Sequence, residues 1–187
     1  MRAAFLLLVL AGCGTPQPAP PVLTPEQRAT MKELAFKSAR EGDAETLSEC
    51  LDAGQDVNEA NARGDTLLTV AAYNGQAGVV ELLLARRGVA VDVRNKMGLT
   101  ALSAAAFKGR ADIARTLLDA GADANAASPA GQTALMFAAL AGKVDVVEVL
   151  LAAGASPAAA DKKGNTARGI AETQGADDVV RLLDAAK

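Results

Sequence analysis

The feature that most constrains this chain is a block that recurs at a nearly fixed step from residue 30 to residue 187. One glycine of the block falls at positions 42, 75, 109, 142 and 175, in steps of 33, 34, 33 and 33. Three further features recur with nearly the same step, namely a threonine (Thr66, Thr100, Thr133, Thr166), an apolar pair (Leu83-Leu84, Leu117-Leu118, Leu150-Leu151, Leu182-Leu183) and a second glycine (Gly54, Gly88, Gly121, Gly154). A fixed period of this length indicates a repeat protein, in which each unit contacts its neighbours along the chain.

The residue types in the block predict two antiparallel helices and a turn in each unit. The recurring threonine can cap the first helix, because its hydroxyl accepts a hydrogen bond from the backbone N–H groups at a helix start. Small pairs such as Ala138-Ala139 let neighbouring first helices approach closely. Glycines 64, 98, 131 and 164 stand in the turn before that helix, where we expect a positive φ. No unit can bury its apolar face alone, so stacking must form the core.

The start of the repeat region predicts its own pair of helices. Thr24 stands three residues before Gln27, with Pro25 between them at the first helical position, which is the arrangement of a capping box. This helix is expected to end near Gly42. Asp43 can then cap a second helix that carries Leu47, Cys50 and Leu51.

These motifs resemble the ankyrin repeat, a unit of this same length made of a turn and two antiparallel helices. The resemblance implies an all-α ankyrin-repeat solenoid of helix-turn-helix units with short turn or hairpin fingers. We expect a repeat domain at residues 25–187, with units at about 30–60, 61–94, 95–127, 128–160 and 161–187. The second unit has one extra residue, which we place at the end of its second helix near Arg86-Arg87.

The sequence departs from the usual Thr-Pro-Leu-His start of an ankyrin unit. Thr69 and Ser103 stand at the His position and can still make a side-chain bond across the turn, whereas Met136 cannot. In the last unit Arg168 replaces a core leucine. This replacement is expected of a capping unit whose outer face meets water.

Residues 1–12 have the order of a secretory signal peptide. A positive charge at Arg2 is followed by a short apolar run, which is far shorter than the roughly 20 apolar residues of a membrane-spanning helix. The run ends in Leu10-Ala11-Gly12-Cys13, which resembles the bacterial lipobox. The resemblance implies cleavage before Cys13 and attachment of lipid to its sulfur. An ordinary signal peptide with an incidental cysteine is the alternative.

Residues 13–24 are expected to be a tether between the lipid and the repeat domain. Their four prolines favour an extended chain with a reach of about 30 Å. The lipobox implies the bacterial cell envelope. Gly14 stands where an aspartate tends to retain such proteins at the inner membrane, so the resemblance favours the outer membrane, facing the periplasm.

The composition argues against catalysis. The chain has no histidine, which is the commonest general base and metal ligand. Cys13 is assigned to lipid, and Cys50 stands where other units have leucine, so we expect it to be a small buried hydrophobe. The net charge of −3 argues against phosphate binding, which needs a clustered excess of Lys and Arg. We therefore expect no enzymatic activity, no cofactor, no metal and no nucleic-acid partner.

A protein partner is the remaining expectation, because ankyrin repeats mostly bind proteins with the turn tips and the inner face of the first helices. Tyr73, Phe107 and Leu140 stand at equivalent positions, so a stack places them in one row. They are either contact residues for a partner or core packing between helices. The residues expected at the binding surface are Arg63, Asp65, Tyr73, Asn74, Lys96, Met97, Leu99, Phe107, Lys108, Gln132 and Leu140.

We therefore predict a lipid-anchored, non-enzymatic scaffold that captures one partner protein on the turn tips and concave face of the stack. Two alternatives stay open. The first is a structural envelope lipoprotein without a specific partner. The second is an immunity or protective protein for an envelope enzyme or toxin.

Overall fold

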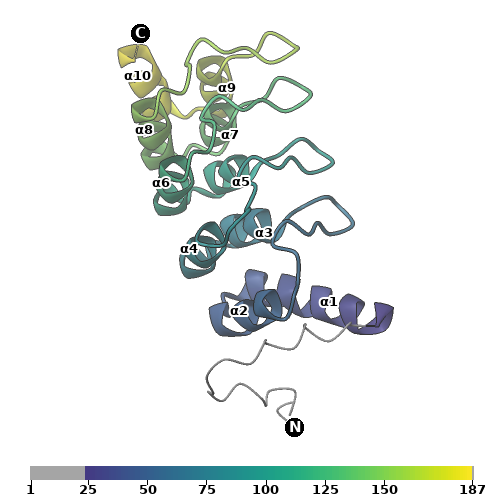
Figure 1. The fold of residues 1–187 in the computed structure, drawn as a ribbon. Coiled ribbons are helices and arrows are strands. Elements are labelled where there is room, and N and C mark those ends of the chain that lie inside the picture. Colours follow the sequence, from purple (N-terminus) through teal and green to yellow (C-terminus); the bar gives the residue numbers. More distant parts are fainter. Residues whose placement is uncertain (1–23, 187) are drawn as a thin grey trace.

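The computed structural model describes residues 24–186, which contain ten helices arranged as five antiparallel pairs (Figure 1). The first helices of the pairs are α1 (Pro25–Glu41), α3 (Leu67–Asn74), α5 (Ala101–Lys108), α7 (Ala134–Leu140) and α9 (Ala167–Gln174). The second helices are α2 (Ala44–Asp52), α4 (Ala77–Leu84), α6 (Ala111–Asp119), α8 (Val144–Ala152) and α10 (Asp177–Ala185). The predicted signal peptide, Cys13 and the tether up to residue 23 lie outside the described residues. Among residues 24–186, no helix is both long enough and apolar enough to cross a membrane.

The five pairs stack in sequence order and form a solenoid. Each first helix packs against the first helices of the neighbouring units, and the second helices form a second row behind them (Figure 1). The loops between units project on the side opposite the second helices (Figure 1). The predicted all-α solenoid of helix pairs is therefore confirmed.

Each loop between units is a hairpin, and we name these hairpins finger 1 (residues 60–66), finger 2 (94–100), finger 3 (127–133) and finger 4 (160–166). A polar residue at the start of each finger closes the turn. In finger 2, Asn95 Oδ1 accepts from the N–H groups of Met97 and Leu99, both at 2.9 Å. The equivalent pair of bonds is accepted by Asn61 in finger 1, by Ser128 in finger 3 and by Asp161 in finger 4. These side-chain bonds add to the backbone bonds of each finger, which in finger 2 run from Asn95 N–H to the Leu99 carbonyl and from Gly98 N–H to the Asn95 carbonyl.

The tip of each finger is a glycine with positive φ, as predicted. Gly98 shows why only glycine fits there. Its φ is +81°, and a Cβ atom would lie 2.1 Å from Cδ of Pro129 in the next finger. Finger 2 and finger 3 therefore touch at their tips because Gly98 has no side chain.

The predicted helix caps are confirmed. The hydroxyls of Thr66, Thr100, Thr133 and Thr166 each accept from the backbone N–H three residues later. The capping box at the start of α1 is also present, with Thr24 N–H donating to Gln27 Oε1 at 2.8 Å. As expected, the hydroxyl groups of Thr66 and Thr69 lie 3.1 Å apart, and those of Thr100 and Ser103 do the same.

The core lies between the helix rows and is built from alanine, leucine and valine. The alanine pairs in the middle of α3, α5 and α7 are fully buried, which lets these helices pack closely. The second helices contribute Leu83, Leu117, Leu150 and Leu183, all at most 1% exposed. Each such leucine stabilises the stack by about 1.5–3 kcal/mol. Cys50 is also buried, as predicted, and burial raises the pKa of its thiol.

The apolar pair predicted for the last unit is wrong by one residue. Leu183, not Leu182, is the fully buried leucine and stands one period after Leu150. Asp184 therefore stands where Leu151 lies in the preceding unit. Its carboxylate accepts from Arg168, with Nε at 2.7 Å from Oδ1.

Arg168 closes the end of the stack, as expected of a capping residue. Besides Asp184, its guanidinium binds Glu172 through Nη1 at 2.6 Å. Both partners are exposed, so solvent screens these pairs and they add little to the stability of the fold. The value of Arg168 is that it presents a polar surface where interior units bury a leucine.

The extra residue of the second unit was predicted to lengthen the second helix near Arg86-Arg87, and this prediction is wrong. Helix α4 ends at Leu84 and is not lengthened, and the extra residue lies in the turn at 85–88. Arg86 turns away from the helix there, with its guanidinium 2.5 Å from Asp52 Oδ1 and 2.6 Å from Ser48 Oγ. These contacts to α2 favour the turn over another helical residue.

Candidate binding surface

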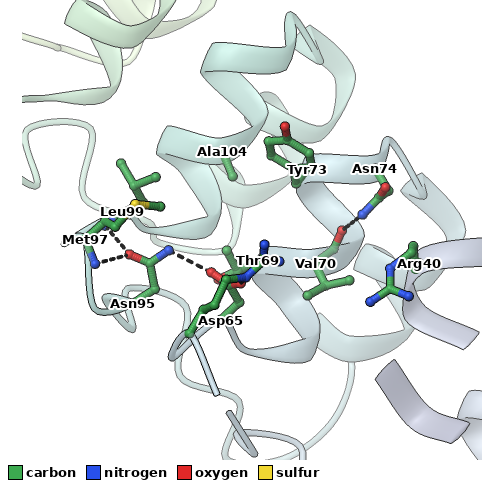
Figure 2. Close-up of a pocket in the computed structure, with 11 residues that line it drawn as sticks. Arg40, Asp65, Thr69, Val70, Tyr73, Asn74, Asn95, Met97, Leu99 and Ala104 are labelled. Atoms are coloured by element: carbon green, nitrogen blue, oxygen red, sulfur yellow. Dashed lines mark hydrogen bonds and ion pairs between the residues drawn. The ribbon is translucent and has the colours of Figure 1, made fainter. Parts of the chain in front are cut away.

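Finger 1, finger 2 and the helices behind them border a hollow of about 270 Å³ on the face that carries the fingers (Figure 2). Helices α1, α3 and α5 supply the rest of its lining. Six of the residues predicted for the binding surface line it, namely Arg63, Asp65, Tyr73, Asn74, Met97 and Leu99. The sequence therefore predicted about half of this lining.

Five further residues line the hollow and were not predicted, namely Arg40, Thr69, Val70, Asn95 and Ala104. Arg40 had a usable signal, because it stands one period before Tyr73 in the same row of the repeat. Val70 and Ala104 are buried small side chains, which the repeat pattern identifies only as core. The position of Asn95 depends on how two fingers pack, which a single repeat does not reveal.

Asp65 is buried, although it was predicted at an exposed turn tip. Asn95 Nδ2 donates to Asp65 Oδ1 at 2.7 Å (Figure 2). Arg63 Nε and Asn61 Nδ2 donate to Asp65 Oδ2 at 3.0 and 3.2 Å. Burial raises the pKa of Asp65, but these hydrogen bonds and the charge of Arg63 outweigh it and hold the pKa below its ordinary value. The carboxylate therefore ties finger 1 to finger 2 and is not presented to a partner.

The fingers are joined in pairs by backbone bonds. Lys96 N–H donates to the Arg63 carbonyl at 3.0 Å, which joins finger 1 to finger 2. Lys162 N–H donates to the Ala130 carbonyl at 2.9 Å, which joins finger 3 to finger 4. Pro129 stands at the equivalent position between finger 2 and finger 3 and has no N–H to donate.

The row of Tyr73, Phe107 and Leu140 lies at the surface and not in the core. Their exposed fractions are 45%, 40% and 41%, and Met97 at the tip of finger 2 is 67% exposed. The ammonium group of Lys108 lies 4.9 Å from the centre of the Tyr73 ring. This contact joins the ends of α3 and α5 and is worth about 0.5–1 kcal/mol at an exposed site.

The other predicted residues lie outside the hollow along the same face. Lys96 is exposed at the tip of finger 2, and Phe107 and Lys108 end α5. Gln132 is half-buried in finger 3, and Leu140 ends α7. They follow the stack away from finger 2 towards the C-terminal units.

Basic and acidic residues are unequally distributed between the two sides of the stack, although Arg115 and Arg181 lie on second helices and Glu41 ends α1. The fingers and the C-terminal ends of α1 and α5 carry the exposed basic residues Arg40, Arg63, Arg94, Lys96, Lys108, Lys162 and Lys163. The carboxylates in the fingers, Asp65 and Asp161, both accept hydrogen bonds within the fingers. The second helices carry Glu45, Glu49, Asp52, Glu81, Asp112, Asp119, Asp145, Glu148, Asp177, Asp178 and Asp184.

Comparison with known families identifies the repeat. Residues 35–128, half of the chain, match the family model of ankyrin repeats in three copies, and residues 117–171 match a second model of ankyrin repeats in many copies. The chain belongs to the ankyrin repeat family. No curated protein matches the chain.

Ankyrin repeats serve as scaffolds for protein–protein interaction and are typically not enzymes, and this chain carries them over most of its described length. The chemistry of the ankyrin fingers fits that role, since their carboxylates and amides are used to hold the hairpins in place. Within residues 24–186, His, Cys, Asp and Glu side chains form no group of three that could hold a metal ion. Exposed cations and apolar side chains lie on this face, and Glu41 is exposed beside Arg40 at the end of α1.

Proposed function

We propose that this chain is a non-enzymatic scaffold that captures one partner protein on the fingers and the inner helix ends of its ankyrin stack, while lipid on Cys13 holds it at a bacterial envelope membrane. The exposed apolar row carries the binding part of this proposal. Tyr73, Phe107, Leu140 and Met97 are four of the five large apolar side chains exposed within residues 24–186. Exposed aromatic side chains gathered on one face support a protein-binding surface, because such anchors dominate binding energy.

The membrane part of the proposal is supported by the order of residues at the start of the sequence. A charge, an apolar run, a small pair and Cys13 follow one another as in bacterial lipoproteins. Two or three acyl chains on one residue give a durable anchor, whereas one gives only marginal binding. With Gly14 after the cysteine, we place the protein at the outer membrane, facing the periplasm.

Cross-linking in the native envelope tests the binding part. We expect wild-type protein to cross-link to one partner at a fixed ratio, and Tyr73→Ala with Phe107→Ala to reduce the yield about tenfold or more. Leu34→Ala is the matched control, because Leu34 is a similarly exposed apolar residue, at 43%, on α1. Equal yields from the double variant and wild type would exclude the row as the site. Absence of any fixed-ratio partner would favour a structural envelope role.

Replacement of the cysteine tests the anchor separately. Cys13→Ser should abolish incorporation of an alkyne-labelled fatty acid and leave an uncleaved or soluble precursor. The measurement is labelling followed by separation of membrane and soluble fractions. Mature, membrane-bound protein in this variant would contradict the lipoprotein assignment. A partner identified as an envelope enzyme or toxin would narrow the function to protection or immunity.

A further inference from the structure

The hollow between finger 1 and finger 2 is bordered by cations that the fold does not neutralise. Arg40, Lys96 and Lys108 are exposed at its edge or beside it, and no ion pair engages them among residues 24–186. Arg63 pairs with Asp65, yet its side chain is 75% exposed. Arg40 and Arg63 line the same hollow as Tyr73 and Met97, Lys96 precedes Met97 in finger 2, and the Lys108 ammonium lies over the Tyr73 ring.

Two further basic residues, Arg110 and Lys143, have a structural explanation. The guanidinium group of Arg110 lies across Gly75, where a Cβ would come within 2.7 Å of it, and Lys143 lies in the same way across Gly109. Both glycines end first helices, where the helix dipole favours a positive charge. The helix dipole does not explain Lys96, because this residue is at a finger tip. Arg40 and Lys108 are at helix ends, but their charged groups remain exposed.

The spacing of the apolar row limits how a partner can lie on it. Packed helices are about 8–10 Å apart, so Tyr73, Phe107 and Leu140 repeat at about that distance. A polyproline-type extended segment repeats its side chains every three residues, or about 9 Å, and an α-helix every seven residues, or about 10 Å. A partner segment therefore matches the row with apolar residues at one of these two spacings.

We propose that the surface around finger 1 and finger 2 takes an acidic segment of a partner protein, with apolar side chains on the row Tyr73, Phe107 and Leu140 and carboxylates against Arg40, Arg63, Lys96 and Lys108. This inference rests on the proposed function and specifies the chemistry of the partner. The supporting argument is charge complementarity, because opposite potentials across an interface set its specificity and association rate.

Other occupants fit less well. Residues 14–23 of this chain contain no Asp or Glu, so the chain's own tether lacks the complementary charge. Nucleic acid requires a broad basic surface, whereas acidic residues outnumber basic ones on the second helices and the net charge is −3. An acidic peptide segment needs only the few cations around the hollow.

Selection from a random peptide library on the full-length chain tests the proposal. Peptides of about fifteen residues are long enough to cross the five units when extended. We expect enriched peptides to carry more Asp and Glu than Lys and Arg. A fluorescein-labelled enriched peptide should then bind in an anisotropy titration about tenfold more weakly in high salt, because salt screens exposed charges.

Charge-reversal variants locate the site. Arg40→Glu with Lys96→Glu should weaken binding of that peptide about tenfold or more, whereas Arg115→Glu on the outer helix α6 should change it less than about twofold. Equal effects from the two variants would overturn the proposal. Equally tight binding of a single-stranded oligonucleotide or of phosphatidylglycerol vesicles would also overturn it, because the surface would then bind anions in general.

The library separates this inference from the proposed function. Enrichment of neutral or basic peptides that are lost in Tyr73→Ala with Phe107→Ala would overturn the acidic partner and leave the binding row intact. Enriched peptides that bind this variant as well as wild type would overturn both. Absence of enrichment would overturn the acidic segment, while the cross-linking yield in the envelope would still decide whether a partner exists.

Discussion

Asp92 lies in the loop between α4 and finger 2, at a position where neighbouring units carry asparagine. Asn58 donates its amide to the Gly88 carbonyl at 2.8 Å, and Asn125 repeats this arrangement two units later. Asp92 accepts from Asp123 N–H at 3.1 Å but has no N–H to donate, and its Oδ1 is buried without a hydrogen-bond partner in the described structure. Asp92 therefore lacks the amide donor that Asn58 and Asn125 supply at this position.

Asp92→Asn should raise the free energy of unfolding by about 1 kcal/mol, because the new amide can donate where the carboxylate cannot. Urea denaturation monitored by circular dichroism measures the change. Asn58→Asp is the control and should lower stability, since it removes the donor to Gly88. An Asp92→Asn variant no more stable than wild type would show that the buried Oδ1 costs nothing.

Gly98 and Gly164 provide a matched pair at the finger tips, with φ of +81° and +82°. A Cβ at Gly98 would lie 2.1 Å from Pro129, whereas one at Gly164 would meet nothing within 4 Å. Gly164→Ala should cost about 1–2 kcal/mol for the left-handed backbone alone. Gly98→Ala should cost a further 1–3 kcal/mol or so, because fingers 2 and 3 must separate. Equal losses on thermal unfolding would contradict the tip contact.

At the scale of an element, finger 2 is held by Asn95 in two ways. Asn95 Oδ1 accepts the two backbone bonds within the finger, and Asn95 Nδ2 donates across to Asp65 in finger 1. Ser128 in finger 3 accepts only the bonds within its own finger, from Ala130 and Gln132, both at 3.2 Å. The comparison of these two residues separates closure of a finger from its attachment to the next one.

Asn95→Ala should lower the free energy of unfolding by about 2 kcal/mol more than Ser128→Ala, because it leaves the buried Asp65 carboxylate without its shortest hydrogen bond. Chemical denaturation of both variants gives the difference. Hydrogen exchange of the Lys96 amide, which joins fingers 1 and 2, should accelerate in Asn95→Ala only. Equal losses in the two variants would mean that the bond between the fingers adds nothing.

The sequence predicted elements well wherever a residue acts within its own unit. The threonine caps, the finger glycines and the hydroxyl pair at Thr66 and Thr69 are local, so their spacing determines their geometry. The prediction failed where a side chain reaches another unit. Arg86 leaves its helix to bind α2, and Asp65 turns inward to meet Asn95, and neither contact is visible in a single repeat.

The same distinction applies to the binding surface. The period placed Tyr73, Phe107 and Leu140 in one row but left open whether that row faces the core or the solvent. The exposure of these three side chains depends on how closely α3, α5 and α7 pack. The alanines between the helices set that distance, which is a property of the whole stack. The row lies at the surface because these alanine pairs already fill the space between the helices.

At the scale of the whole molecule, the stack is a linear chain of contacts with two unequal ends. Every interior helix pair packs against neighbours on both sides, whereas α9 and α10 pack against the α7–α8 pair alone. In such an array stability is roughly a sum of unit and interface terms, so the end unit can open while the rest stays folded. The last unit also presents the polar group of Arg168 in place of an apolar contact.

Leu150 and Leu183 test this description, because they are equivalent leucines, 0% and 1% exposed, in an interior and an end unit. Leu150→Ala should lower global stability by about 3 kcal/mol and speed hydrogen exchange throughout α3 to α8, since the cavity weakens two interfaces. Leu183→Ala removes the same atoms but should speed exchange mainly in α9 and α10. Mass-spectrometric exchange resolves the helices. Uniform acceleration in Leu183→Ala would mean that the stack unfolds as one cooperative unit, so that its end cap controls the stability of the binding fingers.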